Sequence, residues 1–259
     1  MTSILIIESN TPDLLAKGKS GAVPFLRAFQ GLAPELRISV ECPYAAPLAD
    51  DALDGIDGVV FSGSGVAWAT DAEEAAPLRA SMTQVFDTGR PVWGSCNGLQ
   101  LAAVVLGGAV GASPNGMEIG LAKEIAPTEA GKLHPMMVGR HDGYCVPCVH
   151  RDEVQALPDG AVLLAGNAHS PVQAMAYEAG GVDFWGVQYH PEMTALDVAG
   201  ASGGRGVFGD GEDLTPFLKV ADTDPDATVR LGGQADSLVP GVRTRELANW
   251  LAHVRARAH

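Results

Sequence analysis

Basic residues and long apolar runs are both scarce in this sequence. Lys and Arg number 17 against 31 Asp and Glu, for a formal net charge of −14. Because binding to nucleic acid through its phosphates requires clustered Lys and Arg, we exclude nucleic acid as a partner. No apolar run reaches the roughly 20 residues that a membrane-spanning helix needs, so we also exclude a membrane. The first residues lack a basic segment before an apolar one, which argues against a secretion signal and favours a cytoplasmic location.

Cysteine is also sparse, and the four thiols are Cys42, Cys96, Cys145 and Cys148. We expect free thiols rather than a disulfide framework in a chain of 259 residues. Cys145 and Cys148 form a C-x-x-C pair with His150 two residues on, which leaves open a redox pair or half of a zinc site. The pair lies in a strand-like segment without a second ligand pair, so we favour two packed thiols and expect no metal.

What the sequence does contain is a regular succession of apolar strands and helix-like segments. Short apolar segments that do not alternate are predicted as buried strands: 3–8, 37–42, 58–63 and 90–96. The helix-like segments are 21–32, 71–89 and 98–108. Strands that are apolar along their whole length and alternate with helices indicate an α/β fold, with a mostly parallel central sheet flanked by helices.

The second half of the sequence is organised differently. Strand-like segments separated by short turns fill 120–190, which predicts antiparallel strands added to the sheet. A Gly-, Asp- and Pro-rich stretch, 199–241, is expected to be an irregular insertion with one short helix at 214–220. The segment 242–259 has apolar residues at helical spacing and is predicted to pack as a helix on the domain. We therefore predict a main domain over 1–198 that carries both segments.

A cysteine lies at the junction of a predicted strand and a predicted helix, in the segment Gly-Ser-Cys-Asn-Gly (94–98). This pattern is typical of a nucleophile elbow with cysteine in place of serine. Small neighbours allow the strand and the helix to approach each other, and the helix N-terminus favours the Cys96 thiolate. The backbone N–H of Asn97 would then stabilise an oxyanion. A buried structural cysteine at a tight turn is the alternative, and the pattern alone does not decide.

A cysteine nucleophile needs a base, and one of the seven histidines has a suitable setting. His190 follows an apolar strand in the segment Tyr-His-Pro-Glu. The proline favours extended chain, in which residues two apart point the same way, so Glu192 can orient the imidazole. A surface turn is the alternative. His253 and His259, in the terminal helix and tail, are expected to face solvent.

Together, the two segments resemble the motifs of the class I, triad-type glutamine amidotransferases, and in particular the amidotransferase domain of GMP synthase. The family motif Gly-x-Cys-x-Gly-x-Gln reads GSCNGLQ here, and Gly-x-Gln-x-His-Pro-Glu reads GVQYHPE, with 94 positions from Cys96 to His190. The segment GVVFSGSG (58–65) is similar to the oxyanion loop of the family. Weaker matches are SPNGMEIG and VHRDEV, and the resemblance covers residues 3–193. It implies a flavodoxin-like three-layer fold.

The resemblance implies hydrolysis of the glutamine side-chain amide without a metal or an organic cofactor. Cys96 would attack the γ-carbonyl, His190 would move the proton and Glu192 would hold the imidazole, and water would cleave the γ-glutamyl thioester. The implied oxyanion donors are the backbone N–H groups of Asn97 and Ser64. Four further positions match residues that hold the substrate in the family: Gly63, Gln100, Glu118 and His150.

Four positions depart from the family pattern. Asn97 stands where a large apolar residue is usual, and Leu99 where histidine is frequent. Ser95 replaces a β-branched residue, and Gly65 replaces the proline of the loop. None of these is a member of the implied triad. We expect Asn97 and Leu99 to line the substrate pocket, where they would affect which γ-glutamyl compound is accepted.

These residues do not determine which leaving group departs from the γ-carbonyl. A glutaminase would pass ammonia to a separate synthetase subunit, because the Gly-rich remainder after the motifs is too short for a synthetase domain. The alternative is a γ-glutamyl peptide or amide hydrolase that acts alone with the same three residues. A third hypothesis is a binding module that kept the fold without catalysis. The partner of an enzyme of either kind is a small-molecule substrate.

Overall fold

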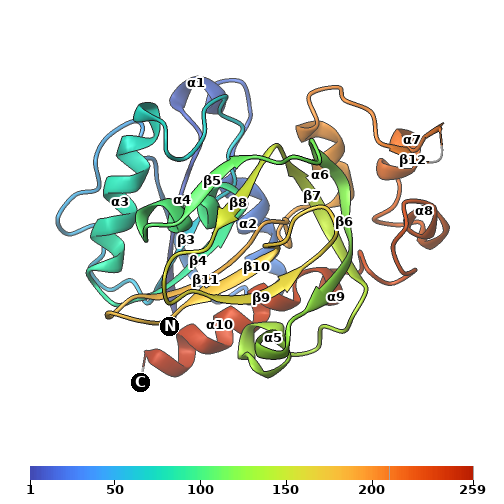
Figure 1. Cartoon of the computed structure of the whole chain (residues 1–259). Helices are drawn as coiled ribbons and strands as arrows, with labels where there is room; N and C mark the ends of the chain where they lie inside the picture. Colours follow the sequence, from blue (N-terminus) through green and yellow to red (C-terminus); the bar gives the residue numbers. More distant parts are fainter. Residues whose placement is uncertain (210, 259) are drawn as a thin grey trace.

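One nine-stranded mixed sheet forms the centre of the computed structural model, which describes residues 1–209 and 211–258 (Figure 1). The strand order is β2-β1-β3-β4-β11-β10-β9-β6-β7. The strands are β1 (Ser3–Ile7), β2 (Arg37–Glu41), β3 (Gly58–Phe61), β4 (Pro91–Ser95), β6 (Glu118–Pro127), β7 (Tyr144–His150), β9 (Val162–Gly166), β10 (Ala174–Tyr177) and β11 (Asp183–Val187). Pairing is parallel from β2 through β4 to β11 and antiparallel from β11 through β10, β9 and β6 to β7. The predicted α/β fold with added antiparallel strands is confirmed.

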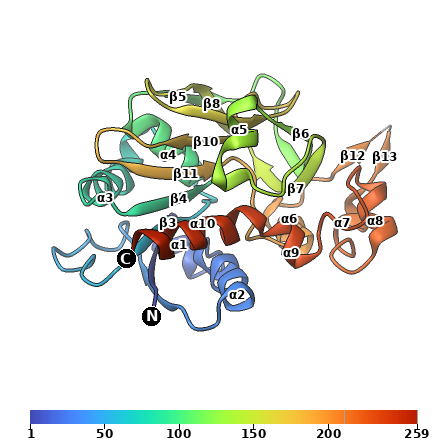
Figure 2. The same cartoon turned by 90° about the horizontal axis from the view of Figure 1, so that it is seen from below.

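Helices cover both faces of the parallel half of the sheet. The helices of the described chain are α1 (Pro12–Leu15), α2 (Ala22–Leu32), α3 (Ala76–Phe86), α4 (Asn97–Val105), α5 (Glu129–Leu133), α6 (Ala195–Ala201), α7 (Thr215–Leu218), α8 (Pro225–Arg230), α9 (Pro240–Arg243) and α10 (Arg245–Arg257). Short 3-10 turns occupy Glu73–Ala75 and Pro135–Met137. Figure 2 shows α2 and α10 on one side of the sheet and α3 and α4 on the other.

Strand β1 illustrates why the buried strands are apolar at every position. Ile4 and Ile6 belong to the core under α2 and α10, whereas Leu5 and Ile7 belong to the core under α3 and α4. Successive side chains of a strand point to opposite faces, so a sheet with a helical layer on each face must be apolar at both. The predicted terminal helix is present as α10, with its apolar residues buried.

Two features of the second half differ from the expectation. A separate antiparallel pair, β5 (Ala109–Ala112) with β8 (Asp152–Ala156), lies outside the main sheet and was not predicted. In the stretch expected to be irregular, 199–241, α7 lies inside the predicted helix 214–220. The stretch also contains part of α6, all of α8, the start of α9, and a small hairpin of β12 (Phe208–Gly209) and β13 (Glu212–Asp213). The description of this stretch as irregular is therefore wrong. Local caps, such as the capping box of Thr194 with Asp197, start helices too short to show an apolar period. Residue 210 lies outside the described residues.

These short helices pack on the antiparallel end of the sheet. Apolar residues of α6, α7 and α8 form a third core with Leu121 of β6 and Cys145 of β7. Within the described residues, the helices are all too short or too polar to cross a bilayer.

Candidate active site

Cys96 lies at the sharp turn between strand β4 and helix α4, as the elbow pattern predicts. Its backbone has φ 50° and ψ −101°, a region that L-residues avoid, so the turn is strained. The N–H of Cys96 donates to Val187 O at 2.8 Å, and its carbonyl accepts from the N–H of Gln100 at 3.0 Å. The thiol therefore stands at the N-terminus of α4, where the helix dipole favours a thiolate.

The two glycines of the elbow provide space. A Cβ on Gly94 would lie 2.6 Å from the carbonyl carbon of Gly98, and a Cβ on Gly98 would lie 2.4 Å from the carbonyl oxygen of Phe61. Both contacts are with backbone atoms, which cannot rotate away. The prediction that small residues let the strand and the helix approach is confirmed.

His190 and Glu192 meet Cys96 just beyond the end of β11, the parallel neighbour of β4. His190 Nδ1 lies 2.6 Å from Glu192 Oε1, and the Cys96 thiol is near enough to the same imidazole to raise its pKa. The expected extended chain is wrong, because residues 190–193 form a turn closed by the Met193 N–H on His190 O at 3.2 Å. The turn is buried rather than on the surface, since His190 is 4% exposed and Glu192 is 3% exposed. The structure brings together the three residues that the motifs single out.

The charge state of His190 follows from opposing effects. Burial alone would lower the pKa of this histidine, because the imidazolium loses its water. The negative charge of Glu192 and the hydrogen bonds with Cys96 and Glu192 outweigh burial, and they raise the pKa of His190 to about 10. The imidazole is therefore protonated at neutral pH and can deliver a proton to a leaving group.

The loop after β3 lies against this imidazole. A Cβ on Gly63 would be 2.6 Å from His190 Cε1, so the missing side chain makes room for the ring. The N–H of Gly65 donates to Asn10 Oδ1 at 2.7 Å. An N–H group can donate to an oxyanion only if no protein group already accepts from it. Among the described residues, the N–H of Ser64 has no protein acceptor. The oxyanion role of Ser64 stays a prediction.

Asn97 and Leu99 have different environments, although both were expected to line the pocket. Asn97 is the first residue of α4, so its N–H has no acceptor inside the helix. Its side-chain Oδ1 is buried without a partner in the described chain. Leu99 is fully buried in the core between the sheet and α3, so its placement in the pocket is wrong. Residues two apart on a helix point to different sides, which separates the two side chains.

The implied substrate residues are held by contacts within the protein. Gln100 Nε2 donates to Asp152 O at 2.6 Å and to Gln188 Oε1 at 3.1 Å. Gln100 is one turn of α4 from Cys96, and these bonds tie the elbow helix to β8 and to the chain after β11. Its substrate role, like that of Gly63, is untested.

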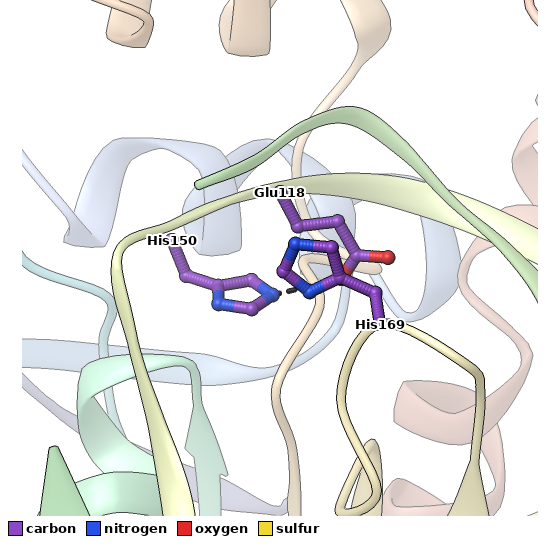
Figure 3. A group of neighbouring side chains, drawn as sticks. All are labelled: Glu118, His150 and His169. Carbon is purple, nitrogen blue, oxygen red and sulfur yellow. Dashed lines mark hydrogen bonds and ion pairs between the residues drawn. The ribbon is translucent and has the colours of Figure 1, made fainter. Parts of the chain in front are cut away.

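Glu118 and His150 face each other across β6 and β7 (Figure 3). His150 Nε2 lies 2.8 Å from Glu118 Oε2, and Gln173 donates to the same oxygen at 2.9 Å. Asn167 donates to Glu118 Oε1 at 2.9 Å. Burial favours the neutral carboxyl, but the hydrogen bond and charge of His150 outweigh it and lower the pKa of Glu118. Both residues stay predicted substrate contacts.

A metal ion is the other chemistry to consider at this cluster. Donor atoms of Glu118, His150 and His169 lie within 4.8 Å of one another. However, the carboxylate oxygens already accept from three protein donors, and His169 Nδ1 lies 3.2 Å from Ser170 Oγ. We therefore interpret the cluster as a hydrogen-bonded network, and the absence of a metal remains a prediction.

The other thiols and the terminal histidines complete the predicted set. All four cysteines are free, as expected. Burial raises the pKa of Cys145 and of Cys148, which fits packed thiols. The expectation that His253 faces solvent is wrong, because His253 Nε2 lies 2.8 Å from an Asp183 oxygen and its ring stacks on an indole of β11. His259 lies outside the described residues.

One contact that holds the turn of His190 and Glu192 was not predicted from the sequence. Arg243 Nη1 donates to Pro191 O at 2.9 Å and to Met193 O at 2.7 Å, on either side of Glu192. Nothing in the local sequence signals this contact, because Arg243 is 50 positions from Met193 and follows a stretch without a recognisable pattern.

The comparisons with known proteins agree with this geometry. The family model of glutamine amidotransferase class-I matches residues 35–197. The chain belongs to this family. As a class-I glutamine amidotransferase, it is an enzyme that hydrolyses an amide C–N bond.

Relatives of this amidotransferase fall into two groups. A γ-glutamyl-L-1-hydroxyisopropylamide hydrolase of a Pseudomonas species is 31% identical over 97% of this chain and 92% of its own length. The GMP synthase of Bordetella avium is 36% identical over 57% of this chain, which spans 27% of that enzyme. A solved glutamine amidotransferase from Thermotoga maritima has the same fold, with a TM-score of 0.65 at 17% identity over 98% of this chain and 97% of its own.

Proposed function

We propose that this enzyme hydrolyses γ-glutamyl amide bonds through a thioester on Cys96. The observation that carries the proposal is the buried pair of His190 and Glu192 beside Cys96, which lies at a strained elbow that begins a helix. A cysteine, a base within hydrogen-bond reach and a carboxylate behind the base are the parts that nucleophilic amide hydrolysis needs. A binding module would have no use for the strained turn, which disfavours the third hypothesis.

The reaction has two halves. The Cys96 sulfur attacks the γ-carbonyl carbon, and the N–H groups of Asn97 and Ser64 stabilise the oxyanion. The oxyanion collapses, the C–N bond breaks, and the His190 imidazolium gives its proton to the leaving nitrogen. Water then attacks the thioester carbon while neutral His190 takes a proton from it, and the C–S bond breaks to release the γ-carboxylate. Glu192 holds the imidazole in both halves.

The leaving group is proposed to be an amine larger than ammonia. The whole-chain relative is a hydrolase of a γ-glutamyl amide, whereas the GMP synthase aligns with only part of this chain. A chain that matches a complete hydrolase is suited to act alone, on a small-molecule substrate. Asn97, with its buried unpartnered oxygen next to the nucleophile, replaces the large apolar residue that is usual in the family.

Glutamine itself is the second candidate substrate, and the matches to GMP synthases favour it. In that case ammonia would pass to a separate synthetase subunit. A cytoplasmic location suits either substrate.

A panel of amides separates these candidates. Purified protein is incubated with glutamine, γ-glutamyl alkylamides, γ-glutamyl amino-alcohol amides and γ-glutamyl dipeptides, and the glutamate and amine are identified by mass spectrometry. We expect release of amines from γ-glutamyl amides, with glutamine as the poorer substrate. Cys96→Ala should abolish all turnover and the γ-glutamyl mass adduct on the enzyme. Inactivity of the wild type on the whole panel, or full activity of Cys96→Ala, would refute the proposal.

A further inference from the structure

The second oxygen of Glu192 has a partner that the family motif does not provide. Ser95 Oγ lies 3.0 Å from Glu192 Oε2, while Glu192 Oε1 faces His190. Trp93 Nε1 lies 2.9 Å from the same Ser95 hydroxyl. The indole N–H can only donate and the carboxylate can only accept, so the hydroxyl accepts from Trp93 and donates to Glu192.

The residues of this hydrogen-bond chain, Trp93, Ser95 and Glu192, are buried. Trp93 and Ser95 are fully buried, and Glu192 is almost fully buried. Trp93 is itself fixed by Trp250 of α10, with ring centroids 6.3 Å apart. A buried carboxylate oxygen without a donor is costly, because burial keeps bulk water from replacing the serine.

The fold explains how these residues meet. Residues two apart on a strand point to the same face, so Trp93 and Ser95 of β4 face α10 together. In the parallel pair of β4 and β11, Ser95 lies opposite Val187, three positions before His190. The strand that delivers the nucleophile therefore also delivers a donor to the carboxylate that follows the neighbouring strand.

We propose that Ser95, oriented by Trp93, is a positioning residue of the catalytic site that holds the Glu192 carboxylate in the plane required by His190. The proposal rests on the proposed function of Cys96, His190 and Glu192. It assigns a role to the departure at position 95, where Ser95 replaces the β-branched residue of the family pattern. Without the hydroxyl, the carboxylate is free to rotate and the imidazolium loses its fixed partner.

The test compares variants at Ser95 with a matched control. Ser95→Ala and Ser95→Val should lower kcat by about 10- to 100-fold with little change in KM, the rate equivalent of one lost hydrogen bond to a charged group. Ser95→Thr keeps the hydroxyl and should retain kcat. Ser81→Ala removes another buried serine hydroxyl, on α3, and should change neither quantity. Trp93→Phe removes the donor to Ser95 and should cause a smaller loss than Ser95→Ala.

The pH profile adds a readout that a packing defect would not move. Without this donor the Glu192 carboxylate no longer keeps its place beside the imidazolium, so the pKa of His190 falls and the alkaline limb of kcat moves to lower pH in Ser95→Ala and Ser95→Val. The charged groups that face Glu192, which are His190 and Arg243, are the same in every variant. Ser95→Thr should keep the wild-type limb.

A second measurement needs no substrate. The rate of Cys96 alkylation by iodoacetamide is followed against pH by peptide mass, and its midpoint should move to higher pH in Ser95→Ala and Ser95→Val but not in Ser95→Thr. Equal midpoints, or wild-type kcat and alkaline limb in Ser95→Val, would overturn the role of Ser95. If the wild type hydrolyses none of the amides, the proposed function fails, while the alkylation midpoints still decide for or against the role of Ser95.

Discussion

At Gly63, a missing side chain makes room for the imidazole of His190. The would-be Cβ lies 2.6 Å from His190 Cε1, and the ring cannot retreat because Glu192 holds its other side at 2.6 Å. At Gly65, two residues on, the nearest atom to a Cβ is 3.8 Å away, which is ordinary contact. A side chain at position 63 would therefore displace the imidazole, whereas one at position 65 has space.

We predict that Gly63→Ala will lower kcat by at least about 10-fold, because His190 must shift from the line between Cys96 and Glu192. Gly65→Ala is the control in the same loop and should keep most of the activity. Steady-state kinetics, with thermal melting to confirm folding, measure the difference. Equal activity of the two variants would contradict the placement of the loop against His190.

At the scale of elements, the terminal helix α10 and the residues just before it bond to the chain on both sides of His190 and Glu192. Glu246 of α10 accepts from the Tyr189 hydroxyl at 2.6 Å, next to His190, and pairs with Arg140 through both of its oxygens at 2.7 Å. Arg243, just before α10, bonds to the carbonyls on either side of Glu192. The sequence predicted α10 only from its apolar face, but this helix also provides the Glu246 carboxylate that bonds to Tyr189 next to His190.

We predict that Glu246→Leu will destabilise the protein by about 3–5 kcal/mol, because it leaves the buried Arg140 without its partner. The double variant Arg140→Met with Glu246→Leu should recover most of this loss, since two apolar side chains need no pairing. Chemical denaturation of both variants and the wild type provides the free energies. A double variant less stable than Glu246→Leu would argue against a dominant cost of the unpaired charge.

At the scale of the whole molecule, the paired His190 links stability to pH. Its pKa is raised from 6.5 to about 10, so the folded protein binds this proton more tightly than the unfolded chain. The resulting stabilisation is fully present below pH 6.5 and is lost as the pH rises through about 10.

We therefore predict that the difference in unfolding free energy between the wild type and His190→Gln decreases from pH 6 to pH 10. Urea denaturation at several pH values measures this difference. The same comparison in a Glu192→Gln background is the control, because without the carboxylate most of the pH dependence should disappear. A difference that is constant over this range would show that Glu192 does not hold the proton on His190.

The sequence by itself determined the features that depend on neighbouring residues. Apolar segments predicted β1, β3 and β4, because a sheet covered on both faces must be apolar along each strand. The prediction that β2 is buried is wrong, because β2 is the edge strand and most of its residues are exposed. Gly94 and Gly98 predicted the elbow, because close approach of backbone leaves no space for a Cβ. The extended chain predicted from Pro191 is wrong, because residues 190–193 form a turn, and it is this turn that brings Glu192 to the imidazole.

Only the tertiary structure decided which distant residues meet these features. Ser95 and Glu192 are 97 positions apart, and their contact exists because β4 and β11 are parallel neighbours whose ends lie at one edge of the sheet. Leu99 enters the core and Asn97 does not, because the packing of α4 on the sheet sets which side is buried. Arg243 reaches the turn of His190 and Glu192 only because the short helices α6 to α9 bring the chain back to it. Such contacts depend on the packing of whole elements, and no local pattern records them.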